Sequence, residues 1–166
     1  MRSSARDREI ASLDSLTGVM GRRAGLLALD REVTRAERTQ QALLVGFVDV
    51  DHLKRVNDDR GHEAGDQVLI GVAVALRDNT RPYDLIFRYG GDEFVCAFPA
   101  VAAAFGESWA ARVNSELVAT SGGASVTVGF AELRPSEDGP QLLARADEAL
   151  YRLRQHDRDR VPPPRV

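Results

Sequence analysis

The sequence predicts an α+β domain in which a central, mostly antiparallel sheet of about five strands is flanked by helices. Segments with apolar residues at helical spacing alternate with short apolar runs typical of strands. Two of these runs lie on either side of a glycine pair at positions 90 and 91, which predicts a β-hairpin and therefore antiparallel pairing. The length of 166 residues suits one domain with one core.

The first half of the chain gives a helix, a strand and two further helical segments. Residues 19–38 carry apolar residues on one helical face, and residues 43–50 form a continuous apolar run that predicts a buried strand. A short helical turn around residues 54–57 comes next. The helix after it would have Asp66 as its N-cap. Its inward-facing residues would be Leu69, Val72, Ala73 and Leu76.

The second half predicts the hairpin, another helix, a strand and a final helix. Residues 84–98 form the hairpin, which Pro99 ends. In the alanine-rich helix that follows, the larger apolar residues recur four apart, at Phe105, Trp109, Val113 and Leu117. Residues 124–131 alternate and predict a strand. The last helix begins near Pro140, and its apolar stripe comprises Leu142, Ala146, Ala149 or Leu150, and Leu153.

The composition narrows the classes of partner. A net charge of −3, with arginines spread through the chain, gives no basic patch for a nucleic-acid polymer or an anionic membrane. The single cysteine, Cys96, cannot form an internal disulfide and is expected to be a small buried group. The three histidines lack zinc-ligand spacing. With neither a membrane-spanning run nor a signal-peptide core, we expect a cytoplasmic protein.

The segment from Arg88 to Phe94 carries the most specific signal. Its two glycines would allow a tight turn with positive φ, and Asp92 and Glu93 follow at once. A turn requires glycine but does not require two carboxylates behind it. Their position beside bare backbone suits a cation and a phosphate. The alternative interpretation is an ordinary acidic hairpin tip.

Two further motifs make that alternative less attractive. The apolar run 43–50 ends in Asp49-Val50-Asp51 and is followed by spaced polar residues, and a separate Asp-Ser-Leu-Thr-Gly segment lies at 14–18 before Arg22 and Arg23. In order and spacing, residues 14–158 resemble the GGDEF family, the diguanylate cyclases that make cyclic di-GMP from GTP. The resemblance implies a palm-like fold as in nucleotide cyclases. It places the domain at 14–160. The polar segment 1–13, with charges of both signs, is expected to be a linker or tail, and the prolines at the end predict a disordered tail at 161–166.

The resemblance assigns metal-binding and catalytic roles to the acids. Asp49, Asp92 and Glu93, with the backbone carbonyl of Val50, would hold two Mg²⁺ or Mn²⁺ ions. The catalytic residues would be Asp92, Glu93 and Lys54. Whether Glu93 binds metal or accepts the proton stays open, and Asp51 could equally support the ligands or cap the short helix.

The resemblance also assigns a GTP site. Asn57 and Asp66 would read the guanine edge, although Asp66 could merely cap its helix. The remaining contacts would go to phosphate, from His52, Leu53, Lys54, Gly91, Arg154 and Arg158. Arg154 stands where the family usually has lysine, and a planar fork is not equivalent to a point charge. Both arginines could instead belong to a solvated helix end.

Arg81 and Asp84 match an inhibitory site for cyclic di-GMP, at a fixed distance before the glycine pair. The alternative is a salt bridge within the turn. Arg88 is expected to orient the glycine turn or to pair with Asp84. Together these residues predict a homodimeric diguanylate cyclase under product inhibition. A catalytically inactive receptor that binds GTP or cyclic di-GMP is the alternative function.

Overall fold

The structure of the protein, a computed structural model, describes residues 12–160, with side chains up to residue 157. The expected tails at 1–13 and 161–166 lie almost wholly outside these residues. The described elements, in chain order, are α2 (Arg22–Thr39), β1 (Leu43–Val50), α3 (Leu53–Arg60), α4 (His62–Asp78), β2 (Leu85–Arg88), β3 (Glu93–Pro99), the short 3₁₀ helix η1 (Ala103–Phe105), α5 (Gly106–Thr120), β4 (Val126–Glu132) and α6 (Gly139–Arg160).

The sheet has the order β2-β3-β1-β4, and every neighbouring pair is antiparallel. The α+β class is therefore confirmed, with four strands among the described residues instead of about five. Beyond these strands, Met20 makes two isolated bridges, an antiparallel one with Leu13 and a parallel one with Phe87 at the β2 edge. The bridge to Phe87 is the only pairing that adds to the sheet among the described residues. It does not extend because α2 begins two residues later, at Arg22.

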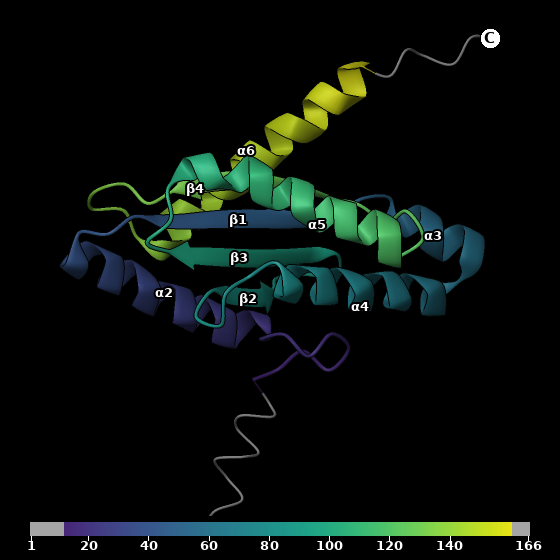
Figure 1. Ribbon diagram of the computed structural model, residues 1–166, viewed down its shortest axis with the longest axis horizontal. Helices are drawn as coiled ribbons and strands as arrows, with labels where there is room; N and C mark the ends of the chain where they lie inside the picture. The colour runs from purple at the N-terminus through teal and green to yellow at the C-terminus, as the bar shows by residue number, and fades with distance from the viewer. Residues whose placement is uncertain (1–11, 161–166) are drawn as a thin grey trace, which may run out of the picture.

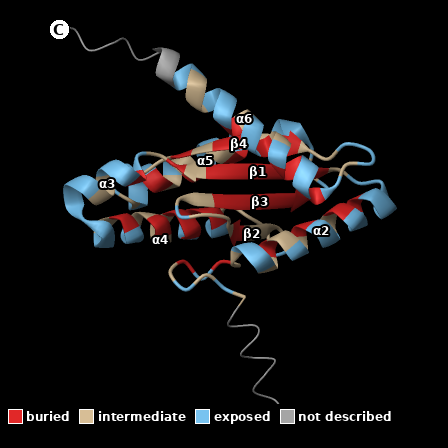
Figure 2. Ribbon diagram, turned by 180° about the vertical axis from the view of Figure 1, so that it is seen from behind, coloured by how far each residue is buried: buried red, intermediate tan, exposed pale blue. Residues whose placement is uncertain are grey.

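Helices cover both faces of the sheet (Figure 1). Even-numbered residues of β1 such as Leu44 and Val48 belong to the core cluster with α4 and α5, and odd-numbered residues such as Val45 and Phe47 to the cluster with α2 and α6. Buried positions therefore run through β1 and β3 (Figure 2). β1 lies between two partners and two helical layers, which fixes the side chains at its ends.

Most predicted core positions are buried, and the exceptions have local causes. The α4 stripe and Cys96 are buried as expected. Helix α2 starts later than predicted, because the Met20 carbonyl accepts from Arg88 N at 2.9 Å. Leu153 is 45% exposed, because α6 continues past the edge of the sheet (Figure 1). None of the helices between residues 12 and 160 combines the length and hydrophobicity that spanning a membrane would require.

Candidate functional site

A row of polar residues lies at one end of the sheet. Asp49, in β1, is directly opposite Glu93 of β3 and Thr127 of β4. All three have the residue parity of the sheet face that α2 and α6 cover, since Phe47, Val95 and Ala131 belong to that core cluster. Alternation along three antiparallel strands therefore brings two carboxylates and a hydroxyl together beneath α6.

Arg88 holds the acidic turn that connects β2 to β3. Its Nε and Nη2 donate to the carbonyls of Gly90 (3.2 Å) and Gly91 (2.7 Å), and its Nη1 donates to Asp14 Oδ1 at 3.1 Å. The expected orienting role is therefore observed, but the expected pairing with Asp84 is wrong. Asp14 is the partner, because its loop runs beside β2, where Met20 bridges Phe87.

The turn glycines provide space and not an unusual backbone conformation. Neither Gly90 nor Gly91 has positive φ, contrary to the expectation from the sequence. A Cβ at position 90 would press against the Glu93 carboxylate, whereas one at position 91 would meet nothing within 4 Å. Val50 N donates to Asp92 O at 2.9 Å, which fastens the turn to the end of β1. The first glycine therefore makes room for Glu93, and the second leaves open backbone.

Arg154 of α6 reaches the same end of the sheet. Its Nη2 donates to Asp49 Oδ2 at 2.7 Å and lies 2.9 Å from Asp51 Oδ1. Asp51 also accepts from Ser125 Oγ at 2.5 Å and from Thr127 Oγ1 at 2.7 Å. No side chain caps α3, so Asp51 is a supporting partner of the site and not a helix cap.

A cavity of roughly 680 Å³ opens at this position. It collects most of the residues that were predicted to bind metal or phosphate, namely Asp49, Val50, His52, Leu53, Lys54, Asp92 and Arg154. His52 precedes α3 in the left-handed region, with φ of 57°. That conformation turns the chain sharply from β1 into α3, so that the first residues of the helix line the cavity.

The acids of the site repel one another. Burial raises the pKa of Asp49, the charges of Asp92 and Asp51 raise it further, and Arg154 opposes the rise. Burial also raises the pKa of Glu93, together with the charges of Asp92, Asp49 and Asp147. A bound cation would relieve this repulsion, and carboxylates with a backbone carbonyl are the hard oxygen donors that Mg²⁺ and Mn²⁺ prefer.

The donor chemistry therefore fits a divalent metal, although the ligands are not assembled in advance. Within residues 12–157, no three or more His, Cys, Asp or Glu side chains already surround a common point. One reason is that the Asp49 carboxylate is engaged by Arg154.

The two predicted guanine-reading residues lie on the helices beyond this cavity. Asn57 is on α3, and its Oδ1 is buried without a hydrogen-bond partner. Gly65 of α4 allows this placement, since a Cβ there would overlap the Asn57 amide. Asp66 is exposed and lies inside α4, whose N-cap is Gly61, so the predicted capping role is wrong. The Asp66 carboxylate is thus open to a ligand, whereas the Asn57 oxygen is enclosed beside Gly65.

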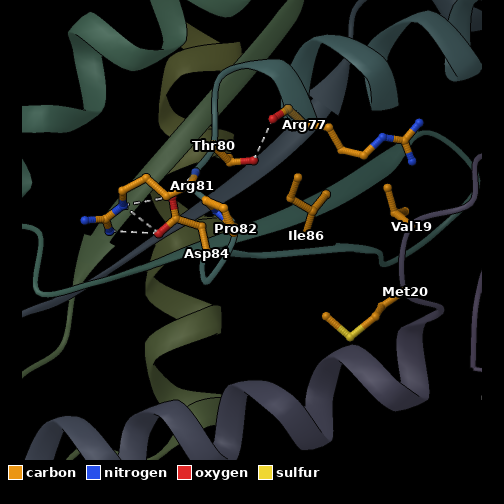
Figure 3. Close-up of a pocket in the computed structure, with 8 residues that line it drawn as sticks. All are labelled: Val19, Met20, Arg77, Thr80, Arg81, Pro82, Asp84 and Ile86. Carbon is orange, nitrogen blue, oxygen red and sulfur yellow. Dashed lines mark hydrogen bonds and ion pairs between the residues drawn. The ribbon is translucent and has the colours of Figure 1, made fainter.

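The predicted inhibitory residues form a compact ion pair on the loop before β2. Arg81 Nη2 lies 2.8 Å from Asp84 Oδ1 and 2.9 Å from Pro99 O, and its backbone N donates to Asp84 Oδ2 at 2.7 Å. The pair borders a cavity of about 390 Å³. Figure 3 shows the Arg81 guanidinium turned away from Ile86 and Val19. The turn salt bridge therefore exists, and Arg81 is engaged by it.

Several residues of the site were not predicted individually. Ser125 and Thr127 have the parity opposite to Val126 and Val128, so the alternation of residues 124–131 could have placed them on the opposite side of the strand from these valines. Tyr151, which lines the main cavity, lies in the predicted last helix. The Arg158 side chain is outside the described part of the chain, so its predicted phosphate contact stays a prediction.

Comparison with known proteins gives a consistent result. Residues 11–160 match the family described as "Diguanylate cyclase, GGDEF domain". Diguanylate cyclase DgcP of Pseudomonas aeruginosa is 38% identical over 93% of this chain, and diguanylate cyclase DosC of Escherichia coli is 36% identical over 93%. The chain spans only 24% and 35% of the lengths of these two relatives.

A solved structure extends the similarity to three dimensions. The crystal structure of the GGDEF domain of DgcB from Caulobacter crescentus in complex with c-di-GMP superposes with a TM-score of 0.83 at 33% identity. The match covers 89% of each chain.

Proposed function

Because this chain belongs to the diguanylate cyclase GGDEF domain family, we propose that it condenses two GTP molecules into cyclic di-GMP with release of two pyrophosphates. The observation that carries the proposal is the meeting of Asp49 and the Asp92 turn at one cavity, with Lys54 and the start of α3 on its wall. Attack of a 3′-hydroxyl on an α-phosphate requires a site that holds a polyanion and offsets developing charge. The cavity has carboxylates that could hold cations, and it has the positive side chains of Lys54 and Arg154 that could contact a polyanion.

The residues of this chain would bind and orient the nucleotide. Lys54 would contact phosphate as a point charge, and the backbone N–H groups of His52 and Leu53 and the open backbone at Gly91 would approach phosphate oxygens. Arg154 and Arg158 would contribute further positive charge from α6. Glu93 would either hold a metal or accept the proton of the attacking hydroxyl.

Asp49, Asp92, Glu93 and the Val50 carbonyl would hold the divalent ions, for which we propose two Mg²⁺ or Mn²⁺ per site. When bound, these ions supply the positive charge that neutralises the triphosphate and the leaving pyrophosphate. Burial first, and then the charges of neighbouring carboxylates, raise the pKa values of Asp49 and Glu93, and a bound cation would offset both effects.

We propose that two copies of the chain face each other during turnover. Each copy would hold one GTP, and each 3′-hydroxyl would attack the nucleotide of the other copy. The product per chain should therefore rise with protein concentration. GTP is a cytoplasmic substrate, so the proposal also implies action in the cytoplasm.

The direct test is mass-spectrometric detection of the product from GTP and, separately, from ATP, with Mg²⁺ or Mn²⁺. We expect cyclic di-GMP from GTP alone, and a higher specific rate for chains fused to a dimerising coiled coil. A dimerised chain that turns over no GTP with either metal would contradict the proposal. Binding of GTP or cyclic di-GMP without turnover would instead support a receptor.

The contact between Gly65 and Asn57 gives a prediction for guanine recognition. Gly65→Ala should weaken GTP binding about tenfold, because the new methyl group would displace the Asn57 amide whose oxygen now lacks a partner. Isothermal titration with GTP measures the loss. Gly21→Ala, before α2 and away from the cavity, tests whether any added methyl group has this effect, since its Cβ would make only an ordinary contact with Ser12 O at 3.4 Å. Unchanged affinity in Gly65→Ala would argue against Asn57 as a base contact.

Product inhibition gives a second prediction, since we propose that Arg81 and Asp84 bind cyclic di-GMP. An arginine fork and a carboxylate together match the edge of guanine. Binding would require the Arg81–Asp84 pair to open. Arg81→Ala should raise the inhibitory concentration of cyclic di-GMP at least about tenfold and leave the uninhibited rate within about twofold. Arg112→Ala, on α5, serves as the charge control, and inhibition that survives in Arg81→Ala would place the product elsewhere.

A further inference from the structure

The most unusual contact of the site is the one between Arg154 and the central acid of the sheet. Arg154 Nη2 is 2.7 Å from Asp49 Oδ2 and 2.9 Å from Asp51 Oδ1, and the Arg154 side chain is only 28% exposed. We propose that Arg154 is an internal counter-ion, which holds the Asp49 carboxylate in the nucleotide-free domain and must leave it before a divalent cation can bind. The inference rests on the proposed role of Asp49 as a metal ligand.

The Arg154 guanidinium is held in place by Asp51, a residue that is itself fixed by several hydrogen bonds. Asp51 accepts from Ser125 Oγ, Thr127 Oγ1 and Arg154 Nη2, and its own backbone N donates to Ser125 O at 2.9 Å. These contacts attach Asp51 to β4 and leave it pointing at α6. Asp51 therefore positions Arg154 beside Asp49, and both of its own carboxylate oxygens are already engaged by Ser125, Thr127 and Arg154.

The same arginine has unused hydrogen-bonding capacity. Its Nε is buried and has no partner, although a guanidinium offers five donors in a fixed fork. A buried donor without a partner is unfavourable, so the Asp49-bound arrangement does not satisfy the side chain fully. A phosphate oxygen pair could accept from Nε and Nη2 at once. Arg154 is thus suited to exchange a carboxylate partner for a phosphate partner.

This exchange makes a prediction that a purely structural ion pair does not make. Removing the guanidinium should strengthen binding of a bare metal ion, because the competitor for Asp49 is gone. It should also weaken binding of the nucleotide without metal, because the phosphate partner is gone. Loss of a merely structural contact would lower stability without moving these two affinities in opposite directions.

The experiment measures Mn²⁺ binding by electron paramagnetic resonance in the absence of nucleotide, and GTP binding by titration in EDTA. The variants are Arg154→Met and Arg154→Lys, with Arg152→Met as the matched control. Arg152 lies on the same helix and loses the same charge, but its partner is Glu148 at 3.5 Å in an exposed pair. Circular dichroism melting confirms that each variant is folded.

For Arg154→Met we expect Mn²⁺ to bind at least about fivefold more tightly and GTP at least about fivefold more weakly than in the parent chain. Both affinities of Arg154→Lys should lie between those of the parent chain and those of Arg154→Met. Arg152→Met should change both affinities less than about twofold. Equal Mn²⁺ affinity in the parent and Arg154→Met, including no binding by either, would overturn the inference. Equal gains in Arg152→Met and Arg154→Met would overturn it as well. Turnover of GTP by the parent chain, measured separately by mass, tells a failed counter-ion role from a failed proposed function.

Discussion

Replacing Asp92 with asparagine should reduce cyclic di-GMP formation by about three orders of magnitude or more while leaving the fold intact. The Asp92 backbone oxygen, which accepts from Val50 N at 2.9 Å, is retained, so the turn keeps its attachment to β1. The lost group is a carboxylate on the cavity wall. Its removal also relieves Asp49 and Glu93 of a charge that raises the pKa of each.

Initial rates from GTP, measured by mass spectrometry with saturating Mg²⁺, check this prediction, and thermal melting checks the fold. Asp58→Asn, at an exposed position on α3, removes the same charge close by and should keep at least about half of the activity. If Asp92→Asn kept a tenth of the parent rate, the cavity would not be the place where GTP reacts.

Replacing Arg88 with methionine should lower both stability and activity. Arg88 and Asp14 form a largely buried pair, with side chains 17% and 19% exposed, and the arginine also holds the Gly90 and Gly91 carbonyls. Loss of the guanidinium leaves Asp14 and these carbonyls without a charged donor. We expect a cost of about 2–3 kcal/mol, reduced from the value for a fully buried pair because some solvent reaches it.

For a domain of this size that cost corresponds to a fall of roughly 5–10 °C in the melting temperature. Activity measured well below the transition should fall at least about tenfold, because the turn that bears Asp92 and Glu93 loses its clamp. Arg22→Met is the matched control: Arg22 also contacts this turn, through the Tyr89 hydroxyl at 3.1 Å, but in an exposed setting. Equal losses in the two variants would show that the Asp14 pair has no special role.

Local sequence patterns predicted well which residues of each strand and helix face the core. The apolar run 43–50 became β1 with the same bounds, and the predicted inward residues of α4, from Leu69 to Leu76, are buried. The positions of Asp49 and Glu93 follow from the same alternation, because a residue's face in a strand is set by its parity. The face of the sheet on which these two acids lie was therefore readable from spacing.

Contacts between distant charged residues could not be read in this way. Arg88 pairs with Asp14 across 74 positions, and Arg154 reaches Asp49 across 105. A pattern shows which face a residue occupies but not which charge lies opposite after folding. The Asp66 error is of another kind, since Gly61, with φ of 86°, already begins α4 upstream. A glycine N-cap leaves little trace in the sequence compared with an acidic one.

The location of Asp49 on an interior strand limits how such a domain could be controlled. The Asp49 carboxylate is carried by a strand that pairs with β3 on one side and with β4 on the other. A loop movement cannot shift this carboxylate, because reshaping β1 would disturb both ladders together. Any change that controls the site must then lie outside β1. It could be a movement of a side chain that reaches the site from a helix, or a change in the distance between two rigid domains. An input signal would accordingly act on such peripheral parts, while the strand that carries Asp49 keeps its place in the sheet.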